Sequence, residues 1–391
     1  MSERVVVAIV SFLIIADLLT GLLFNLHFGF YRIGIFIKSL TIFITFIICL
    51  PLVKKKSIQS IYLTLAILFL FWIIGSLISF FRNDSFDPGN SIIVLSRYFL
   101  FLILSCVFVN LAYQPSFEEK CRKIFETFFL VNNLFIIFGF IFKVDLFSTY
   151  NVEYVHRFGY KGLIYGGNEV AGIYVLGLTY FYRENFKYGE SKKILLIMTC
   201  IAAVLTGTKA TLVGLSAITV YYFIRYRIKV FIILMIPFIL TLVYFVGVYW
   251  EKIKTQYLSF NVHFFETHDL ITFLMSGRDL YIVRNFGYMG SEWSLINFIT
   301  GDAFLYSETD LLDLYFFFGI GSILYLYLYV KIYFLKDKSL DNVFNFLVLM
   351  GIAFTAGHII QSAVVPVFLL LFVFSNKGVK RNETLRDNSF N

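Results

Sequence analysis

Apolar runs of about 20 residues recur along most of this chain, and they constrain its fold more than any other feature. The stretch "IYLTLAILFLFWIIGSLISFF" (61–81) is typical and carries no charge. A helix of about 20 residues spans the roughly 30 Å hydrocarbon core of a bilayer, where the backbone must satisfy its own hydrogen bonds. Only 15% of all residues are charged. The sequence therefore predicts an all-α, polytopic transmembrane helix bundle.

About twelve helices are expected from the hydropathy of successive windows. The seventh and the last of these predicted helices are short. The predicted ranges are 5–26, 33–53, 58–81, 91–112, 124–147, 165–182, 193–206, 209–225, 228–249, 312–334, 341–357 and 363–376.

The basic residues indicate the orientation of these helices. The chain carries a formal charge of +8, but its 33 lysines and arginines are spread over many short connections and form no single basic face. No nucleic-acid partner is therefore expected. If the helices alternate from an inside start, most basic residues fall on the inside, which places both termini in the cytoplasm.

Two outer loops stand out under this topology. One, near 148–165, contains closely spaced glycines in "RFGYKGLIYGGNE" (157–169). The other, 250–311, is rich in aromatic residues and has eight acidic against four basic residues. Such a long loop is usually functional or disordered, and its aromatic content favours short packed helices. We expect one transmembrane domain over 1–376 that includes this loop, followed by a polar cytoplasmic tail at 377–391.

Two cations on the outer side are candidates for binding an anion. Lys209 lies on the corner "LTGTKATLVGL" (205–215), and Arg278 follows a glycine in "SGRDLY" (276–281). The alternatives are that Lys209 extends to the membrane interface and that Arg278 pairs with Asp279 or Glu266. Together such groups would bind phosphate well, since a guanidinium group can donate two parallel hydrogen bonds to phosphate oxygens. Arg157 is a third, weaker candidate.

Candidate proton acceptors lie near the end of the long loop and near the last helix. Glu308 comes just before the predicted helix at 312–334, and Asp310 either complements the dipole of that helix or serves a site. His358, in "AGHIIQSAVVP" (356–366), has an apolar context and is either structural or a proton carrier. His263, Glu266 and His268 lack a helical metal-ligand spacing, so no metal and no cofactor are expected.

Five segments in this order resemble the O-antigen polymerase (Wzy-type) and O-antigen ligase superfamily of bacterial membrane glycosyltransferases. They are "RFGYKGLIYGGNEVAGIY" (157–174), "LTGTKATLVGL", "SGRDLY", "ETDLLDLYFFFGIGS" (308–322) and "AGHIIQSAVVP". The resemblance covers about 150–370, and the first 140 residues match only as hydrophobic helices. It implies transfer of glycan between two undecaprenyl-pyrophosphate-linked units at the periplasmic face of the inner membrane, with a chain-length regulator as a further partner.

The resemblance also implies roles for individual residues. Lys209, Arg278 and Arg157 would bind the pyrophosphate, and the glycan would contact the residues Asn168, Asp310 and Arg284. The family's ligases have a histidine, proposed as general base, eleven residues before the glycine that corresponds to Gly319. Here that position is Glu308, which favours a polymerase and leaves either Glu308 or His358 as the base. A ligase, or a flippase for the same lipid-linked sugars, remains an alternative.

Overall fold

A computed structural model gives the arrangement of the chain and describes residues 2–26, 33–82, 86–112, 114–150, 158–256, 269–303 and 305–375. These residues form helices and, among them, no strand. The predicted all-α architecture is thereby confirmed. Arg157, the tail 377–391 and the trio His263, Glu266 and His268 lie outside the described residues.

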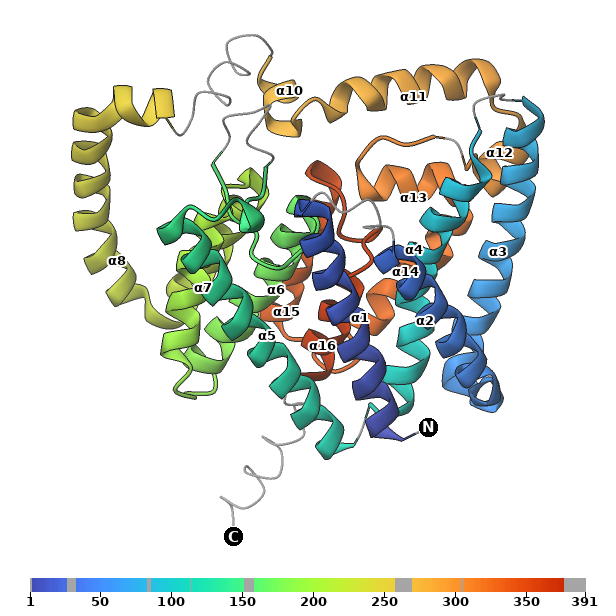
Figure 1. Cartoon of the computed structure of the whole chain (residues 1–391), viewed down its shortest axis with the longest axis horizontal. Coiled ribbons are helices and arrows are strands. Elements are labelled where there is room, and N and C mark those ends of the chain that lie inside the picture. Colours follow the sequence, from blue (N-terminus) through green and yellow to red (C-terminus); the bar gives the residue numbers. More distant parts are fainter. Residues whose placement is uncertain are drawn as a thin grey trace.

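Within the described ranges, five helices are long and apolar enough to cross a membrane, and Figure 1 shows their arrangement. They are α1 (Glu3–Asn25), α2 (Ile33–Cys49) with its 3₁₀ extension η1 (Leu50–Lys54), α3 (Lys56–Arg82), α4 (Pro88–Asn110) and α5 (Pro115–Phe142). The sequence predicts all five within a few residues, except that α5 begins nine residues earlier than expected and is followed by the 3₁₀ turn η2 (Asp145–Phe147). The count of twelve crossing segments stays a prediction.

The second half of the chain has shorter or bent helices. They are α6 (Gly167–Phe186), α7 (Lys193–Leu205), α8 (Lys209–Gln256), α14 (Gly321–Tyr333), α15 (Leu340–Thr355) and α16 (Val365–Ser375). The two helices predicted at 209–225 and 228–249 both lie within α8, whose backbone is kinked and non-helical at Arg227, between them. The predicted boundary between them is thus a bend.

The long loop 250–311 contains helices, and the helix predicted after it is broken. Its described part holds α10 (Leu270–Met275), α11 (Arg278–Glu292) and α12 (Leu295–Thr300), and α13 (Asp310–Phe318) follows. The single helix predicted at 312–334 is wrong, because the chain turns at Gly319 between α13 and α14 with φ of 54°. A Cβ at Gly319 would lie 2.5 Å from the carbonyl oxygen of Ile299, so glycine lets the end of α12 pack there.

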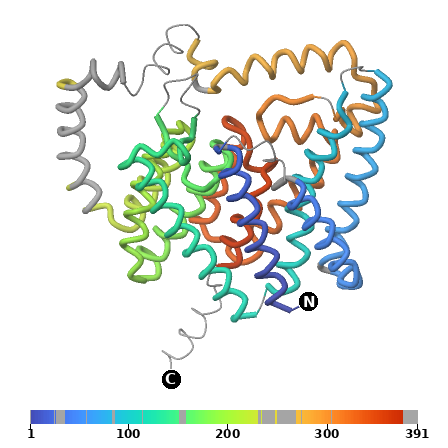
Figure 2. Tube along the Cα trace, viewed as in Figure 1, coloured from blue at the N-terminus to red at the C-terminus, as the bar shows by residue number. Residues whose placement is uncertain are grey.

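The centre of the bundle is α16. All eleven of its residues are buried, and it packs against α4, α5 and α6. Figure 2 shows its trace surrounded by earlier segments of the chain. A helix that is apolar all round is typical of a protein core or a membrane span, and here it is enclosed by other helices.

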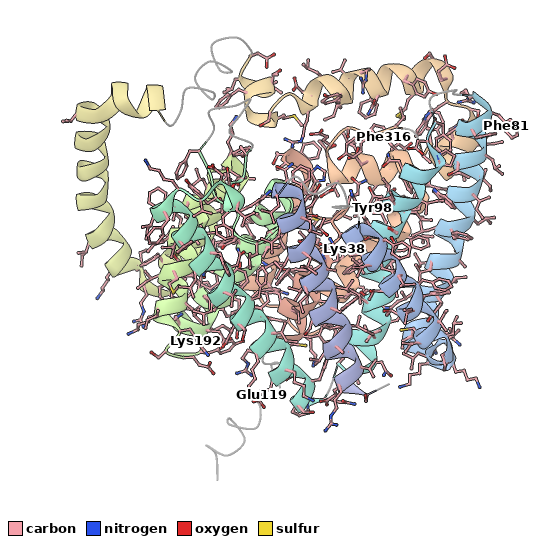
Figure 3. The ribbon with its side chains drawn as sticks, viewed as in Figure 1. Lys38, Phe81, Tyr98, Glu119, Lys192 and Phe316 are labelled. Atoms are coloured by element: carbon pink, nitrogen blue, oxygen red, sulfur yellow. The ribbon has the colours of Figure 1, made fainter. Side chains whose placement is uncertain are left out.

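Aromatic packing fixes α13 and α14 against α4. The ring of Tyr98 on α4 lies 5.4 Å from that of Phe318 and 5.8 Å from that of Tyr325. Tyr98 is fully buried, whereas Phe81 on α3 is 83% exposed at the edge of the bundle, as a lipid-facing residue would be (Figure 3). This packing sets the position of the loops on either side of α13.

We call the end of the bundle that carries α10, α11, α12 and α13 the α11 end. The opposite end carries the α4–α5, α6–α7 and α14–α15 connections (Figure 1). Many of the described lysines and arginines that the predicted topology assigns to the inside lie in these connections or in the helices near them, among them Lys120, Lys187, Lys192 and Lys336.

Candidate functional site

Two loops meet at the α11 end and bring His358 to Tyr306. The Nε2 atom of His358 lies 3.3 Å from the hydroxyl oxygen of Tyr306. His358 belongs to the loop between α15 and α16, and Tyr306 to the loop before α13. Burial raises the pKa of Tyr306, so the phenol stays protonated at neutral pH and can donate to the imidazole.

The carboxylate of Asp310 holds the His358 loop in place. It accepts backbone N–H bonds from four consecutive residues, at N···O distances of 2.9 Å (His358), 2.5 Å (Ile359), 2.9 Å (Ile360) and 3.3 Å (Gln361). Asp310 is 1% exposed. It was predicted to contact glycan, but the backbone uses both of its oxygens, so the structure gives it a positioning role.

Asp313, one helical turn further on α13, holds the loop that carries Tyr306. Its Oδ1 accepts from the backbone N–H of Ser307 at 2.6 Å and from the Ser307 hydroxyl at 2.7 Å. This short helix lies outside the five segments long enough to cross a membrane. Burial raises the pKa of Asp313 to about 7. The i, i+3 carboxylates of α13 therefore fix the two loops that meet at the site.

Glu308 and His358 both have left-handed backbone conformations, with φ of 62° and 60°. Among the described residues only four that are not glycine have positive φ. Such conformations cost about 1–3 kcal/mol each and cluster at functional sites. The loops approach closely here, since a Cβ at Gly357 would lie 2.2 Å from the Glu308 carbonyl oxygen. This strain marks the 308 and 358 loops as a candidate site.

Arg278 connects the Glu308 loop to α11. Its Nη2 atom lies 3.5 Å from Oε2 of Glu308, and its Nη1 donates to the carbonyl of Met275 at 3.2 Å. The guanidinium is largely buried, and its Nε has no hydrogen-bond partner among the described residues. The side chain of Glu308 is 41% exposed. The guanidinium of Arg278 thus links the accessible carboxylate of Glu308 to the C-terminal end of α10 and places a positive charge beside it.

Lys209 reaches the same short helix, α10. Its Nζ donates to the carbonyl of Phe273 at 2.9 Å and lies 3.7 Å from the centroid of the Phe273 ring. The carbonyls that bind Lys209 and Arg278 thus belong to residues two positions apart, at the C-terminal end of α10, where helix carbonyls lack intrahelical partners. The structure brings these two predicted cations to one place.

Two cavities lie on either side of the Tyr306–His358 contact. Cavity 1 has a volume of about 310 Å³ and is lined by His358 and by the predicted glycan-binding residue Asn168. Cavity 2 has a volume of about 530 Å³ and is lined by Tyr306, Glu308 and the exposed Arg284. Arg284 stacks on Tyr281 at 5.1 Å. Lys209 and Arg278 line neither cavity, and Arg278 reaches cavity 2 through Glu308.

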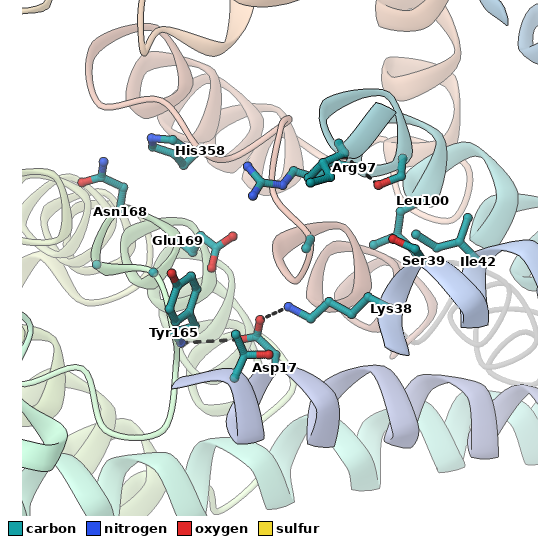
Figure 4. Close-up of a pocket in the computed structure, with 16 residues that line it drawn as sticks. Asp17, Lys38, Ser39, Ile42, Arg97, Leu100, Tyr165, Asn168, Glu169 and His358 are labelled. Atoms are coloured by element: carbon teal, nitrogen blue, oxygen red, sulfur yellow. Dashed lines mark hydrogen bonds and ion pairs between the residues drawn. The ribbon is translucent and has the colours of Figure 1, made fainter. Parts of the chain in front are cut away.

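Sequence reasoning singled out Glu308, His358, Lys209 and Arg278 but missed several groups around them. Nothing in the sequence distinguishes Tyr306 from the other tyrosines of the long loop. The spacing of Asp310 and Asp313 on one helical face could have indicated paired anchors. Asp17, Lys38 and Arg97 are charged residues inside the helices predicted at 5–26, 33–53 and 91–112, and the sequence alone cannot pair them. The structure places all three on cavity 1 (Figure 4).

Comparisons with protein-family models, with curated protein sequences and with solved structures found no match. The chemistry of the site therefore follows from its own groups. A carboxylate and an imidazole can each accept a proton, and nearby cations can stabilise a negative charge that develops during a reaction. The arrangement fits transfer of a group from an anionic leaving group to a hydroxyl.

Proposed function

We propose that this chain is a membrane glycosyltransferase that polymerises polysaccharide repeat units carried on undecaprenyl pyrophosphate. The observation that carries the proposal is a connected set of contacts between distant motifs. Lys209 binds α10, Arg278 pairs with Glu308, the backbone of Glu308 abuts Gly357, and His358 contacts Tyr306. Motifs that resemble those of one enzyme superfamily therefore supply one candidate site.

The proposed reaction joins two lipid-linked units. Glu308, whose carboxylate faces cavity 2, takes the proton from a sugar hydroxyl of the acceptor. The hydroxyl oxygen forms a bond to the anomeric carbon of the donor glycan as the bond from that carbon to pyrophosphate breaks, with inversion. Lys209 and Arg278 neutralise the charge on the departing diphosphate. His358 is the alternative base.

The proposed location is the bacterial inner membrane, with the α11 end in the periplasm and both termini in the cytoplasm. Support comes from the basic connections at the opposite end, because short loops rich in lysine and arginine stay on the cytoplasmic side. Undecaprenyl-linked donor and acceptor would both reach the site from the bilayer. A chain-length regulator is a further proposed partner.

The test is the glycan phenotype of a knockout in the host bacterium, read on lipopolysaccharide gels. A polymerase knockout leaves single-repeat glycan, and the gene restores the ladder of longer chains. Bare lipid core without any repeat would support a ligase instead. Lipid-linked units trapped on the cytoplasmic side would support a flippase, and an unchanged ladder would contradict all three.

A further inference from the structure

Cavity 1 gathers five ionisable side chains inside the helix bundle. They come from five separate elements, namely α1, α2, α4, the start of α6 and the loop before α16: Asp17, Lys38, Arg97, Glu169 and His358. Figure 4 shows their side chains around one space. Ionisable residues at membrane depth are costly and usually face a cavity or a pathway.

The two carboxylates of cavity 1 already have partners within the chain. Asp17 and Lys38 form an ion pair and are 1% and 6% exposed. The other oxygen of Asp17 accepts from the backbone N–H of Tyr165 at 3.5 Å. Glu169 accepts from the hydroxyl of Ser362 at 2.7 Å. The positive charge of Lys38 is thus compensated.

Arg97 differs from these residues. Its guanidinium has no hydrogen bond or ion pair with any residue that the structure describes, and it points into the space between His358 and Glu169 (Figure 4). Arginine stays charged in proteins, and its planar guanidinium group can form bidentate hydrogen bonds with phosphate oxygens. A charged, half-buried group of this kind is stabilised when an anion occupies the cavity.

One wall of cavity 1 is formed by α2, whose other face is apolar and exposed. Lys38, Ser39 and Ile42 of α2 line the cavity, while Phe36 and Phe43 of the same helix are 67% and 61% exposed on its outer side. The hydrocarbon chain of a ligand whose phosphate binds Arg97 would have exposed apolar residues of α2 beside the cavity. The site favours a phosphate carried by a lipid.

We propose that cavity 1 is a second diphosphate site, in which Arg97 binds the phosphate of the acceptor lipid while Lys209 and Arg278 bind that of the donor. This inference rests on the proposed function, which supplies two lipid-linked diphosphates. The Tyr306–His358 contact lies between cavity 1 and cavity 2, so the two substrates approach the reacting groups from different sides.

Native mass spectrometry of the purified full chain with farnesyl diphosphate tests this inference without turnover. We expect two bound molecules per wild-type chain. Arg97→Gln and the double variant Lys209→Ala/Arg278→Ala should each bind one, with the lost site weakened about 10- to 100-fold. Arg97→Lys should weaken it less, because the charge is kept. Arg82→Gln is the matched control, since Arg82 is on α3 outside both cavities, and should bind two.

Several results would overturn the inference. One is two molecules bound to Arg97→Gln with wild-type affinity. Another is that the wild type binds a single molecule and that both Arg97→Gln and Lys209→Ala/Arg278→Ala lose it. These residues would then form one shared site. If inorganic pyrophosphate or phosphatidylglycerol displaces the Arg97-dependent molecule as well as farnesyl diphosphate does, the ligand is not a lipid diphosphate. If cells show the polymerase phenotype but the purified chain binds only one molecule, only this inference is rejected. If the chain binds two molecules but cells lack that phenotype, only the proposed function is rejected.

Discussion

Charged residues at the two ends of the bundle have different partners. At the opposite end, Asp341 is 1% exposed, accepts from the hydroxyls of Tyr221 and Tyr226 at 2.9 and 2.7 Å, and pairs with Arg225 at 3.0 Å. Further pairs follow the same pattern there, including Lys336–Glu118 and Lys192–Glu126. At the α11 end the carboxylates of Asp310 and Asp313 bind loops instead, through backbone N–H groups and the Ser307 hydroxyl.

This difference separates structural charges from functional ones. Pairs between side chains join neighbouring helices at the opposite end. At the α11 end, Asp310 and Asp313 accept hydrogen bonds that position two strained loops, and Arg97 lines cavity 1 without a hydrogen bond to any described residue. Variants at the two ends should therefore affect activity and stability in different proportions.

Glu308→Gln should give the largest loss of activity. Removing a general base costs about 100- to 10,000-fold in rate, while the amide keeps the shape of the side chain. Chain-length ladders from complemented knockout cells, normalised to protein in the membrane, measure this loss. His358→Gln is the parallel variant. Substantial polymerisation by Glu308→Gln together with loss in His358→Gln would move the role of base to His358.

Lys209→Ala and Arg278→Ala should each reduce polymer formation by about 100-fold, because each removes a charge that stabilises the leaving diphosphate. Arg278→Lys should reduce polymer formation by an intermediate amount, since an ammonium group keeps the charge but cannot form the bidentate hydrogen bonds of a guanidinium group. The same ladders and membrane insertion would be measured. Lys123→Ala is a control from the opposite end, where Lys123 is 72% exposed. Wild-type chain lengths in both alanine variants would refute the diphosphate role.

Asp310→Asn and Asp341→Asn compare the two ends directly. Each should lower the free energy of unfolding by about 1–3 kcal/mol, because an amide NH₂ faces groups that need an acceptor. Only Asp310→Asn should also lower activity per folded chain, by about tenfold, because the His358 loop shifts. Thermal unfolding in detergent and turnover of lipid-linked substrate would be measured together. Equal turnover in the two variants would contradict the assigned positioning role.

Asp313→Asn should show the smallest effect, a change in the pH dependence of stability. The folded-state pKa of Asp313 is raised to about 7 from an ordinary value of about 4, so the fold favours the protonated carboxyl. This contribution is complete below pH 4 and is lost as the pH rises to 7. The Tm of the variant minus that of the wild type should therefore increase over this range. A constant difference would show that burial does not shift this group.

Much of the fold could be predicted, because long apolar runs without charge have few alternatives. The five long helices follow from such runs. The break at Gly319 could not be seen, since "LLDLYFFFGIGSILYLY" (311–327) reads as one continuous apolar segment. The break depends on the end of α12 packing beside Gly319, and this tertiary contact has no local signature.

The candidate site was only partly predictable for a similar reason. Lys209, Arg278, Glu308 and His358 are conspicuous as polar residues beside glycines or helix ends. Their partners are not, because Tyr306 resembles many other loop aromatics. Pairing across the bundle, such as that of Asp17 with Lys38, requires knowing which helices are neighbours. The charge of Arg97 was visible in the sequence, but its place in a cavity was not.

The enclosed position of α16 has a consequence for biogenesis. Its eleven residues extend about 16 Å, roughly half the thickness of the hydrocarbon core. Over these described residues α16 contacts other helices and not lipid, so its packing depends on the helices around it. We therefore expect α16 to take its place only when α4, α5 and α6 are folded around it.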